Sequence, residues 1–398
     1  MRVLLVHNFY GSSAPSGENK VFEAERRMLE RRGHEVSVYM RQSDEIRGTG
    51  NGECSTLRKL WGMVKGGLCT IGNPFAARAV AKLCREFKPD VVHFHNTFPL
   101  ISPLAVRAAS EYAPVVMTLH NYRMACAAGV PMRGGKVCSL CLDKRCVWDS
   151  VKHRCYRGSL FATLPLAVNI TLYRKRLPRW VSRFIVLSEF QKRKMVDVGL
   201  PREKIAVKGN FISRVERVER AEKKNQIVYI GRLSPEKGVP TLLRAWRKFG
   251  NETGCKLVLI GDGDFRKEYE KSADGLNVEF LGQISNDQVR TIMATAKSVV
   301  LPSECWETFG LAAAEAMSFG TPIVVSNIGA LPDIVQNGRF GEVFEAGNSK
   351  SLSEAIKRVL YRPDYGDMCA EAGREAAGKY SEEVNYRRLM EIYSGVLQ

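Results

Sequence analysis

The segment of residues 298–320 constrains this chain most, because a strand, a turn and a helix follow one another within it. Residues 298–302, Ser-Val-Val-Leu-Pro, have the apolar run of a buried strand. Residues 311–319 are a strong helix former, which Gly310 opens and Gly320 ends. The turn carries Glu307 and the helix carries Glu315, so two carboxylates stand at a fixed spacing around the helix start.

The start of this helix predicts an anion site. The first amides of a helix lack partners within it and the helix dipole is positive there, so the amides of Phe309, Gly310 and Leu311 suit a phosphate. Glu315 lies about a turn and a half inside the helix and Glu307 outside it, so the two carboxylates cannot contact one ligand atom. Either glutamate alone is typical of a solvated surface. Together they indicate an extended, partly anionic ligand such as a sugar nucleotide.

A second motif lies upstream, where an apolar strand at residues 227–230 runs into the loop Gly-Arg-Leu-Ser-Pro-Glu-Lys-Gly of residues 231–238. This loop is similar to the G-R-L-x-x-x-K-G loop of retaining glycosyltransferases of the family 4 type. Glu307 and Glu315, with seven residues between them, resemble the E-x7-E motif of the same family. The two motifs stand in the order and at the separation of the family, and the resemblance covers essentially the full chain.

The resemblance implies an α/β protein of the GT-B architecture, in which two Rossmann-like domains face a cleft. It also implies that Arg232 and Lys237 clamp the diphosphate of the donor, where cleavage leaves developing negative charge. Glu307 would hold the donor sugar, and Glu315 the ribose hydroxyls. The cradle would be completed by backbone amides, those of Gly17, Phe309, Gly310 and Leu311.

The amino terminus is typical of the opening of a doubly wound α/β domain, with a short strand at residues 3–6, a loop, and a helix over residues 18–32. A dinucleotide fingerprint is absent, which argues against a dehydrogenase. The loop resembles the glycine-rich amino-terminal loop of the family, usually a Gly-Gly pair, of which only Gly17 is found here. Residues 41–72 are polar and rich in glycine, and we expect irregular structure there.

Three histidines stand near the carboxyl ends of expected strands, where ligands gather in open α/β sheets. His93 and His95 belong to the strand end at residues 90–96, and a single histidine of this kind is more often structural than functional. Thr118-Leu119-His120 resembles the T-x-H segment of the family, so His120 is assigned to positioning the donor sugar. A general-base role is not expected of His120, because such a retaining transfer is usually drawn with the donor phosphate taking the proton of the acceptor.

At 398 residues the chain is long enough for two domains. The boundary is expected in the charged stretch 213–225, which gives an amino-terminal acceptor-binding domain of residues 1–209 and a nucleotide-sugar-binding domain of residues 210–380. By the resemblance, a helix over residues 381–398 crosses back to the first domain. No stretch approaches the roughly 20 apolar residues of a membrane span, and the first residues lack a secretory pattern. We expect a cytoplasmic protein that can associate with the inner face of the membrane.

The net charge of +18 is carried by the first half of the chain. Up to Gly209 there are 35 Lys and Arg against 16 Asp and Glu, and the remainder has 25 against 26. Residues 152–194 hold eleven basic residues and one acid, and they bracket an apolar run. This combination fits docking on an anionic membrane surface, where each basic residue near the bilayer contributes ~1 kcal/mol. Nucleic acid is the competing partner, but no nucleic-acid module is recognisable, so we expect none.

Five cysteines cluster between residues 126 and 155. Cys138 and Cys141 have the x2 spacing of half a zinc knuckle, with Cys146 and Cys155 as possible completing ligands. The alternative is a set of free thiols in a loop. This cysteine-containing segment is an insert, and Cys-Tyr-Arg-Gly-Ser follows it at residues 155–159. The combination resembles that of a bacterial subgroup of the family that builds surface polysaccharides, and the insert would shape the acceptor side.

These observations predict retaining transfer of a sugar from a nucleotide-diphosphate sugar, with UDP favoured, to a hydroxyl of a lipid-linked or saccharide acceptor. No metal is expected for catalysis, because Arg232 and Lys237 would supply the countercharge. Two other enzyme activities remain as alternatives, that of a nucleotide-sugar epimerase and that of a phosphorylase. A non-catalytic lipid- or polysaccharide-binding protein is the alternative from another class, against which the intact motifs weigh.

Overall fold

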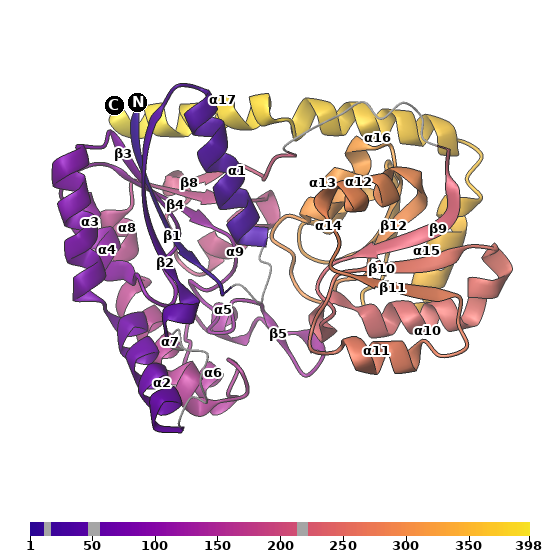
Figure 1. The fold of residues 1–398 in the computed structure, drawn as a ribbon, viewed down its shortest axis with the longest axis horizontal. Coiled ribbons are helices and arrows are strands. Elements are labelled where there is room, and N and C mark those ends of the chain that lie inside the picture. The colour runs from indigo at the N-terminus through magenta and orange to yellow at the C-terminus, as the bar shows by residue number, and fades with distance from the viewer. Residues whose placement is uncertain (12–16, 47–55, 213–221) are drawn as a thin grey trace. The chain divides into compact units, whose positions relative to one another are not determined.

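The computed structural model describes residues 1–11, 17–46, 56–212 and 222–398, and the chain forms two compact units (Figure 1). The first unit comprises Met1–Pro131, Cys138–Gly209 and Tyr386–Gln398, and the second comprises Met132–Val137 and Asn210–Asn385. Most of the boundary stretch expected at residues 213–225 lies outside the described residues.

The first unit is built on a six-stranded sheet in the order β2-β1-β3-β4-β7-β8, and every neighbouring pair is parallel. Its strands, in chain order, are β1 (Arg2–Phe9), β2 (Glu35–Gln42), β3 (Val91–Asn96), β4 (Val115–Leu119), β7 (Arg183–Val186) and β8 (Ile205–Val207). β3 and β4 are buried along their whole length, as expected of a parallel sheet covered by helices on both faces. A separate hairpin consists of β5 (Met132–Arg133) and β6 (Lys136–Val137).

The second unit has a six-stranded parallel sheet in the order β11-β10-β9-β12-β13-β14. Its strands are β9 (Lys224–Ile230), β10 (Lys256–Ile260), β11 (Val278–Gly282), β12 (Ala296–Leu301), β13 (Ile323–Ser326) and β14 (Gly341–Phe344). Counted within the unit, this is the order 3-2-1-4-5-6 of the doubly wound fold. The apolar core packs around Trp246, Tyr229 and Tyr269, all nearly fully buried.

Helices cover both sheets. Those that precede residue 210 are α1 (Gly17–Arg31), α2 (Thr56–Ile71), α3 (Pro74–Phe87), α4 (Pro103–Ser110), α5 (Leu140–Asp143), α6 (Asp149–Lys152), α7 (Leu160–Tyr173), α8 (Leu177–Trp180) and α9 (Glu189–Asp197). Those that follow are α10 (Val239–Phe249), α11 (Arg266–Ser272), α12 (Asn286–Thr295), α13 (Leu311–Ser318), α14 (Leu331–Ile334), α15 (Ser349–Leu360), α16 (Tyr365–Lys379) and α17 (Glu382–Leu397).

The expectation of irregular structure over residues 41–72 was wrong for its second half, where α2 forms. Its glycines allow close packing. A Cβ on Gly62 would lie 2.3 Å from the Ile46 carbonyl oxygen, and one on Gly67 would lie 3.1 Å from Pro165 of α7. Tertiary packing therefore outweighs the low helix propensity of glycine here.

The carboxy-terminal helix α17 packs on the first unit through its last three turns. His93 contacts the Tyr393 hydroxyl through Nδ1 at 2.8 Å, and His34 contacts the Tyr386 hydroxyl through Nε2 at 2.9 Å. Arg388 donates to the carbonyl of Val207 at 3.3 Å. Among the described helices, none combines the length and the apolar character that crossing a bilayer requires.

Candidate functional site

The two motifs of the second unit meet at one place in its sheet. The loop 231–238 follows β9, and the turn 302–310 follows β12. β9 and β12 are neighbours, and the strand order reverses between them. Ligands of doubly wound sheets bind beyond the carboxyl ends of the strands at such a reversal. The topology thus places the predicted donor-binding residues where this fold binds ligands.

Backbone contacts hold the two loops together. A Cβ on Gly238, which has a φ of +72°, would lie 1.7 Å from the carbonyl oxygen of Pro302. The Glu304 amide donates to the Glu236 carbonyl at 2.9 Å. Only glycine can bring the backbones this close at a positive φ, so Gly238 fixes the position of the neighbouring Lys237 relative to the turn.

An ion pair joins the motifs. Lys237 Nζ lies 2.6 Å from Glu307 Oε1, and the Ser303 hydroxyl donates to the same oxygen at 2.6 Å. Burial alone would raise the pKa of Glu307, but Lys237 and Ser303 outweigh it and hold that pKa below its usual value. Burial alone would lower the pKa of Lys237, but the neighbouring Glu307 carboxylate outweighs burial and raises that pKa. Both groups are therefore charged at neutral pH, and both keep about a fifth to a quarter of their side-chain surface exposed, 27% for Lys237 and 19% for Glu307.

The other predicted residues lie around this pair. Arg232 is paired with Glu236 at 2.6 Å, and its side chain is 60% exposed, which leaves the guanidinium able to reach a ligand. Gly310 precedes α13 with a φ of +94°, and Leu311 is the first residue of that helix. Phe309 is buried against Tyr380, with ring centroids 5.6 Å apart. Glu315 lies on α13 and is partly exposed.

The first unit brings the three histidines together. His93 and His95 project from β3 and His120 follows β4, and all three are buried. His95 Nδ1 lies 3.0 Å from His120 Nε2, and the two rings are stacked. His7, at the end of β1, is also buried and lies 3.0 Å from Asn19 through Nε2. β1 and β3 flank the reversal of strand order in this sheet, so the histidines occupy its ligand-binding edge.

Gly17, the predicted residue of the amino-terminal loop, is the first residue of α1 and is exposed. A Cβ built on it meets no atom within 4 Å among the described residues. Residues 12–16, which precede it, lie outside the described residues. The geometry therefore brings Gly17 to a helix start but assigns it no close backbone contact.

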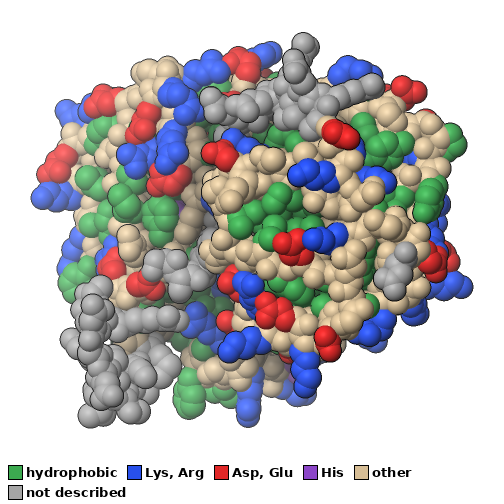
Figure 2. Space-filling model, turned by 45° about the vertical axis from the view of Figure 1, so that its right-hand side comes forward, with side chains coloured by type: hydrophobic (Ala, Val, Ile, Leu, Met, Phe, Trp, Pro, Cys, Tyr) green, Lys and Arg blue, Asp and Glu red, His purple; other side chains and the backbone are tan. Residues whose placement is uncertain are grey.

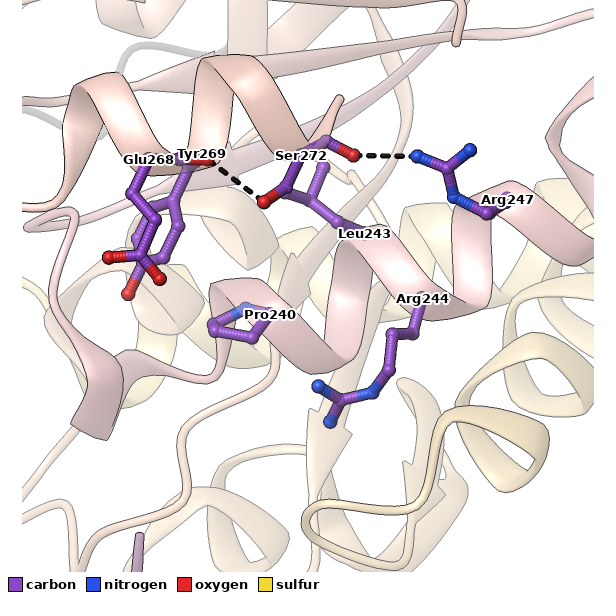
Figure 3. A pocket seen from close by; sticks show the side chains of 7 residues that line it. All are labelled: Pro240, Leu243, Arg244, Arg247, Glu268, Tyr269 and Ser272. Carbon is purple, nitrogen blue, oxygen red and sulfur yellow. Dashed lines mark hydrogen bonds between the residues drawn. The ribbon is translucent and has the colours of Figure 1, made fainter. Parts of the chain in front are cut away.

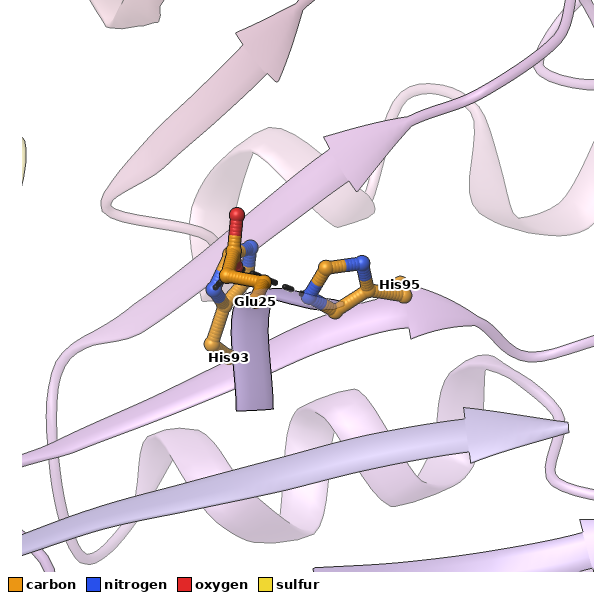
Figure 4. A group of neighbouring side chains, drawn as sticks. All are labelled: Glu25, His93 and His95. Carbon is orange, nitrogen blue, oxygen red and sulfur yellow. Dashed lines mark ion pairs between the residues drawn. The ribbon is translucent and has the colours of Figure 1, made fainter. Parts of the chain in front are cut away.

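Two charged residues of this cluster were not predicted. Glu25 of α1 is 1% exposed, and its Oε1 lies 3.2 Å from both His93 Nδ1 and His95 Nε2 (Figure 4). Lys208, just after β8, lies 2.7 Å from Glu25 Oε2. Burial alone would raise the pKa of Glu25, but the Lys208 ammonium, with the two histidines, outweighs it and holds that pKa well below its usual value. Glu25 stands on the apolar face of α1, beside Val21, Phe22 and Met28. This position of a glutamate among apolar residues is the sequence signal that would have indicated a buried carboxylate.

Among the described residues, no cysteine belongs to a group of three or more metal-ligating side chains whose ligand atoms all lie within 4.8 Å of one another. Within residues 1–11, 17–46, 56–212 and 222–398, one group of three or more metal-ligating side chains has its ligand atoms within 4.8 Å of one another, and it is Glu25, His93 and His95. Cys138, Cys141, Cys146 and Cys155 are not joined in disulfides, and Cys146 is exposed. Burial raises the pKa of Cys141 to about 12, and the neighbouring thiols of Cys126, Cys155 and Cys138 add to this effect. The zinc hypothesis and the free-thiol alternative therefore both stay predictions.

A cavity of about 310 Å³ lies between α10 and α11 of the second unit (Figure 3). Its two arginines are already engaged, because Arg247 donates to the Ser272 carbonyl at 2.8 Å and Arg244 to the Thr241 hydroxyl at 2.8 Å. None of the described residues that the sequence assigns to the site lines this cavity.

The basic, apolar region predicted over residues 152–194 includes α7. Four side chains of α7 are exposed although they are apolar, and Phe161 is 85% exposed. They are Leu160, Phe161, Leu164 and Leu172. Exposed basic residues stand on either side of the helix in sequence, namely Lys152, Arg154, Arg157, Lys175, Arg176 and Arg179. Elsewhere, basic and acidic side chains are interspersed across the face drawn in Figure 2.

Two family models match the chain. The model described as Glycosyltransferase Family 4 matches residues 16–214, and the model described as Glycosyl transferases group 1 matches residues 213–376. Among curated proteins, the chain is similar to the sulfoquinovosyl transferase SQD2 of Arabidopsis thaliana, with 25% identity over 311 residues, 76% of this chain and 56% of that protein. It is also similar to the phosphatidyl-myo-inositol mannosyltransferase of Mycobacterium leprae, with 29% identity over 177 residues, 42% and 46% of the two chains. The chain thus spans about half the length of these relatives.

Solved structures share the fold over the full chain. A glycosyltransferase from Rickettsia africae superposes with a TM-score of 0.68 at 15% identity, covering 100% of this chain and 98% of the other. The Anabaena protein Alr3699/HepE, in complex with UDP and glucose, superposes with a TM-score of 0.66 at 17% identity, covering 99% and 100%. At such identities the likeness establishes the fold, two parallel-sheet α/β units of the GT-B type.

Proposed function

Since the chain belongs to the glycosyltransferases, with a family 4 domain followed by a group 1 domain, we propose that it transfers a sugar from a nucleotide-diphosphate sugar, with UDP favoured, to a hydroxyl, with retention of anomeric configuration. The observation that carries this proposal is the Lys237–Glu307 ion pair at the β9/β12 reversal, beside the start of α13. A cation and a carboxylate held together at this point suit the two parts of such a donor, its diphosphate and its sugar.

The proposed roles in the second unit follow from charge. Lys237 and Arg232 would bind the diphosphate, whose negative charge grows as the bond to the anomeric carbon breaks. Glu307 would accept hydrogen bonds from sugar hydroxyls and Glu315 from the ribose. Because the two cations supply the countercharge, the proposed reaction needs no metal. The new bond forms from the acceptor oxygen to the anomeric carbon, and the acceptor proton passes to the departing phosphate oxygen.

In the first unit, His120 is the residue proposed to position the donor sugar. It is neutral at physiological pH, because burial, with smaller contributions from the neighbouring His95 and His7, holds its pKa well below the usual value. A neutral imidazole has one donor and one acceptor nitrogen, which suits a hydroxyl group. Gly17 and the amides of Phe309, Gly310 and Leu311 complete the proposed donor site.

A thermal-shift panel of UDP-, GDP- and ADP-sugars tests the donor site. One nucleotide should stabilise the wild type, and at about 100-fold excess over Kd the gain is roughly 2.7 kcal/mol. Glu315→Ala should lose most of that gain, whereas Glu354→Ala, another helical glutamate of the second unit, should keep it. The absence of a shift with every nucleotide sugar would contradict the proposal, and release of free nucleotide without transfer would favour an epimerase.

We further propose that the acceptor is lipid-linked or a growing saccharide in surface-polysaccharide synthesis, and that α7 docks on an anionic membrane. The support is the exposed apolar side chains of α7 with exposed basic residues before and after the helix. Arg174 is not part of this surface, because it donates to the Arg145 carbonyl and is only partly exposed. Lys175 and Arg176 are exposed and suit headgroup contacts.

Vesicle flotation tests the docking proposal. Wild type should float with vesicles that contain phosphatidylglycerol and stay behind with pure phosphatidylcholine. The double variant Phe161→Asp/Lys175→Glu should bind at least about tenfold more weakly. It loses an aromatic ring that the membrane would bury, and it reverses a charge. Tyr361→Asp, at a 67% exposed aromatic residue of the second unit, is the matched control and should float like the wild type. Equal flotation of both variants would exclude α7 as the docking surface.

A further inference from the structure

A chain of polar contacts leads from a buried salt bridge to His120. Lys208 Nζ lies 2.7 Å from Glu25 Oε2, and Glu25 Oε1 lies 3.2 Å from His95 Nε2. His95 Nδ1 in turn lies 3.0 Å from His120 Nε2. All four side chains are buried, so water does not screen these contacts.

The charge of Glu25 decides where His95 carries its proton. An ionised carboxylate accepts hydrogen bonds and cannot donate them. The contact between Glu25 Oε1 and His95 Nε2 is not aligned as a hydrogen bond, so its effect is electrostatic. A lone pair on Nε2 would face negative charge at 3.2 Å, whereas an N–H would be attracted to it. His95 therefore carries a proton on Nε2.

The tautomer of His95 then decides that of His120. The Lys208 ammonium already balances the charge of Glu25, so a second positive charge on the buried His95 would be uncompensated. With its single proton on Nε2, His95 has a lone pair on Nδ1 and can only accept there. The 3.0 Å contact must then be donated by His120 from Nε2. His120 is neutral because burial lowers its pKa, so its second nitrogen, Nδ1, carries a lone pair.

A metal ion is the competing explanation for Glu25, His93 and His95, whose ligand atoms lie within 4.8 Å of one another. The groups are already engaged in ways that a metal would have to displace. The Lys208 ammonium neutralises the carboxylate, and a cation beside it would be repelled. His93 contacts the Tyr393 hydroxyl through Nδ1 and the Thr118 hydroxyl through Nε2, each at 2.8 Å. The arrangement suits orientation of side chains better than metal binding.

We infer that Glu25 and His95 are positioning residues that fix His120 as the Nε2–H tautomer, so that its Nδ1 acts as a hydrogen-bond acceptor. With the proposed function, on which this last step rests, the group of the donor sugar that meets His120 is a hydrogen-bond donor, hence a hydroxyl. A carboxylate or sulfonate group, which only accepts, would be rejected at that position.

Imidazole nitrogen NMR on histidine-labelled protein tests the inference, because the chain has only six histidines and each can be assigned by substitution. His95 and His120 should both be Nε2–H in the wild type without ligand. Glu25→Gln should change both histidines to the Nδ1–H tautomer. Lys208 takes the oxygen of the new amide, so its NH2 faces His95 and requires a lone pair on Nε2. The proton of His95 then moves to Nδ1, and His120 Nε2 becomes the acceptor.

Two further variants make the result decisive. Tyr393→Phe removes a hydroxyl from the same cluster without touching the chain to His120, and it should leave both tautomers unchanged. Glu25→Gln/Lys208→Met removes both charges of the buried pair, so it keeps a neutral interior if the single variant does not fold, and His120 should then lose its single tautomer. A wild type with His120 as Nδ1–H, or a His120 that stays Nε2–H in both Glu25 variants, would overturn the inference.

Titration with the stabilising nucleotide sugar separates this inference from the proposed function. Donor binding should perturb the His120 Nδ1 resonance and leave the proton on Nε2. Conversion of His120 to the Nδ1–H form by the donor would overturn the acceptor assignment. If no nucleotide sugar binds, the proposed function fails while the tautomers of the free protein still decide the role of Glu25 and His95.

Discussion

Replacing Lys237 by Met is expected to lower kcat/KM by roughly 10²- to 10³-fold, the usual loss when one group that stabilises developing charge is removed. Lys237 would stabilise the diphosphate as it departs, and it also neutralises Glu307 at 2.6 Å. In the variant, Glu307 loses the cation that lowers its pKa, and the fraction that stays ionised repels the donor as well. We therefore expect KM to rise and kcat to fall in steady-state assays with the donor that the thermal-shift panel identifies.

A double variant separates the two effects. Lys237→Met/Glu307→Gln removes the repulsion, so donor affinity should partly recover, whereas kcat should stay low because the countercharge is still missing. Lys256→Met is the matched control, since Lys256 belongs to the same unit and forms an exposed ion pair with Glu279 at 3.1 Å. It should retain kcat and KM. Full activity of Lys237→Met would remove Lys237 from the proposed mechanism.

The fold and the place where the two motifs meet were largely predictable from the sequence, and the GT-B prediction and the family are confirmed. The reason is physical. In a doubly wound sheet, residues that follow two strands on either side of the strand-order reversal must lie close together. Lys237 and Glu307 are 70 residues apart in sequence, yet each directly follows such a strand and they form an ion pair. Their roles in binding and catalysis stay predictions.

The buried cluster of the first unit was not predictable in the same way. Glu25 and Lys208 are 183 residues apart, and each alone has the appearance of a surface charge on a helix or after a strand. What makes them a pair is their shared burial, which depends on how α1 packs against the sheet that β8 completes. Interpreting His93 and His95 as structural histidines was reasonable from sequence, since the contacts that join them to Glu25 and join His95 to His120 appear only in the folded chain.

Acidification below pH 6.5 is expected to destabilise the protein steeply, because three buried histidines resist protonation in the folded state. Burial lowers the pKa of His7 to about 3 and that of His93 to about 4, and it lowers that of His120 well below its usual value. In the unfolded chain each titrates near 6.5. Between those values the unfolded state binds more protons, so the free energy of unfolding falls as the pH falls.

Each of these histidines contributes roughly 1–2 kcal/mol per pH unit in this range, and small domains have only about 5–15 kcal/mol in total. Glu18 opposes the trend, because burial raises its pKa and its protonation favours the folded state as the pH falls. The three histidines together predict a loss of roughly 6 kcal/mol by pH 5, which the contribution of Glu18 reduces. Urea titrations from pH 7.5 to pH 5 should show the free energy of unfolding falling with a slope of about two to three protons at the acid end, three from the histidines less up to one from Glu18.

Single variants assign that slope to its sources. His93→Gln, which cannot take up a proton at this position, should reduce the slope by about one proton relative to the wild type. His153→Gln is the matched control because His153 is exposed, and it should leave the slope unchanged. If stability is constant between pH 7 and pH 5, the histidines of the folded protein titrate as they do in the unfolded chain. This result would exclude the neutral state of His120. Both the proposed contact of His120 with the sugar and its fixed tautomer depend on that state.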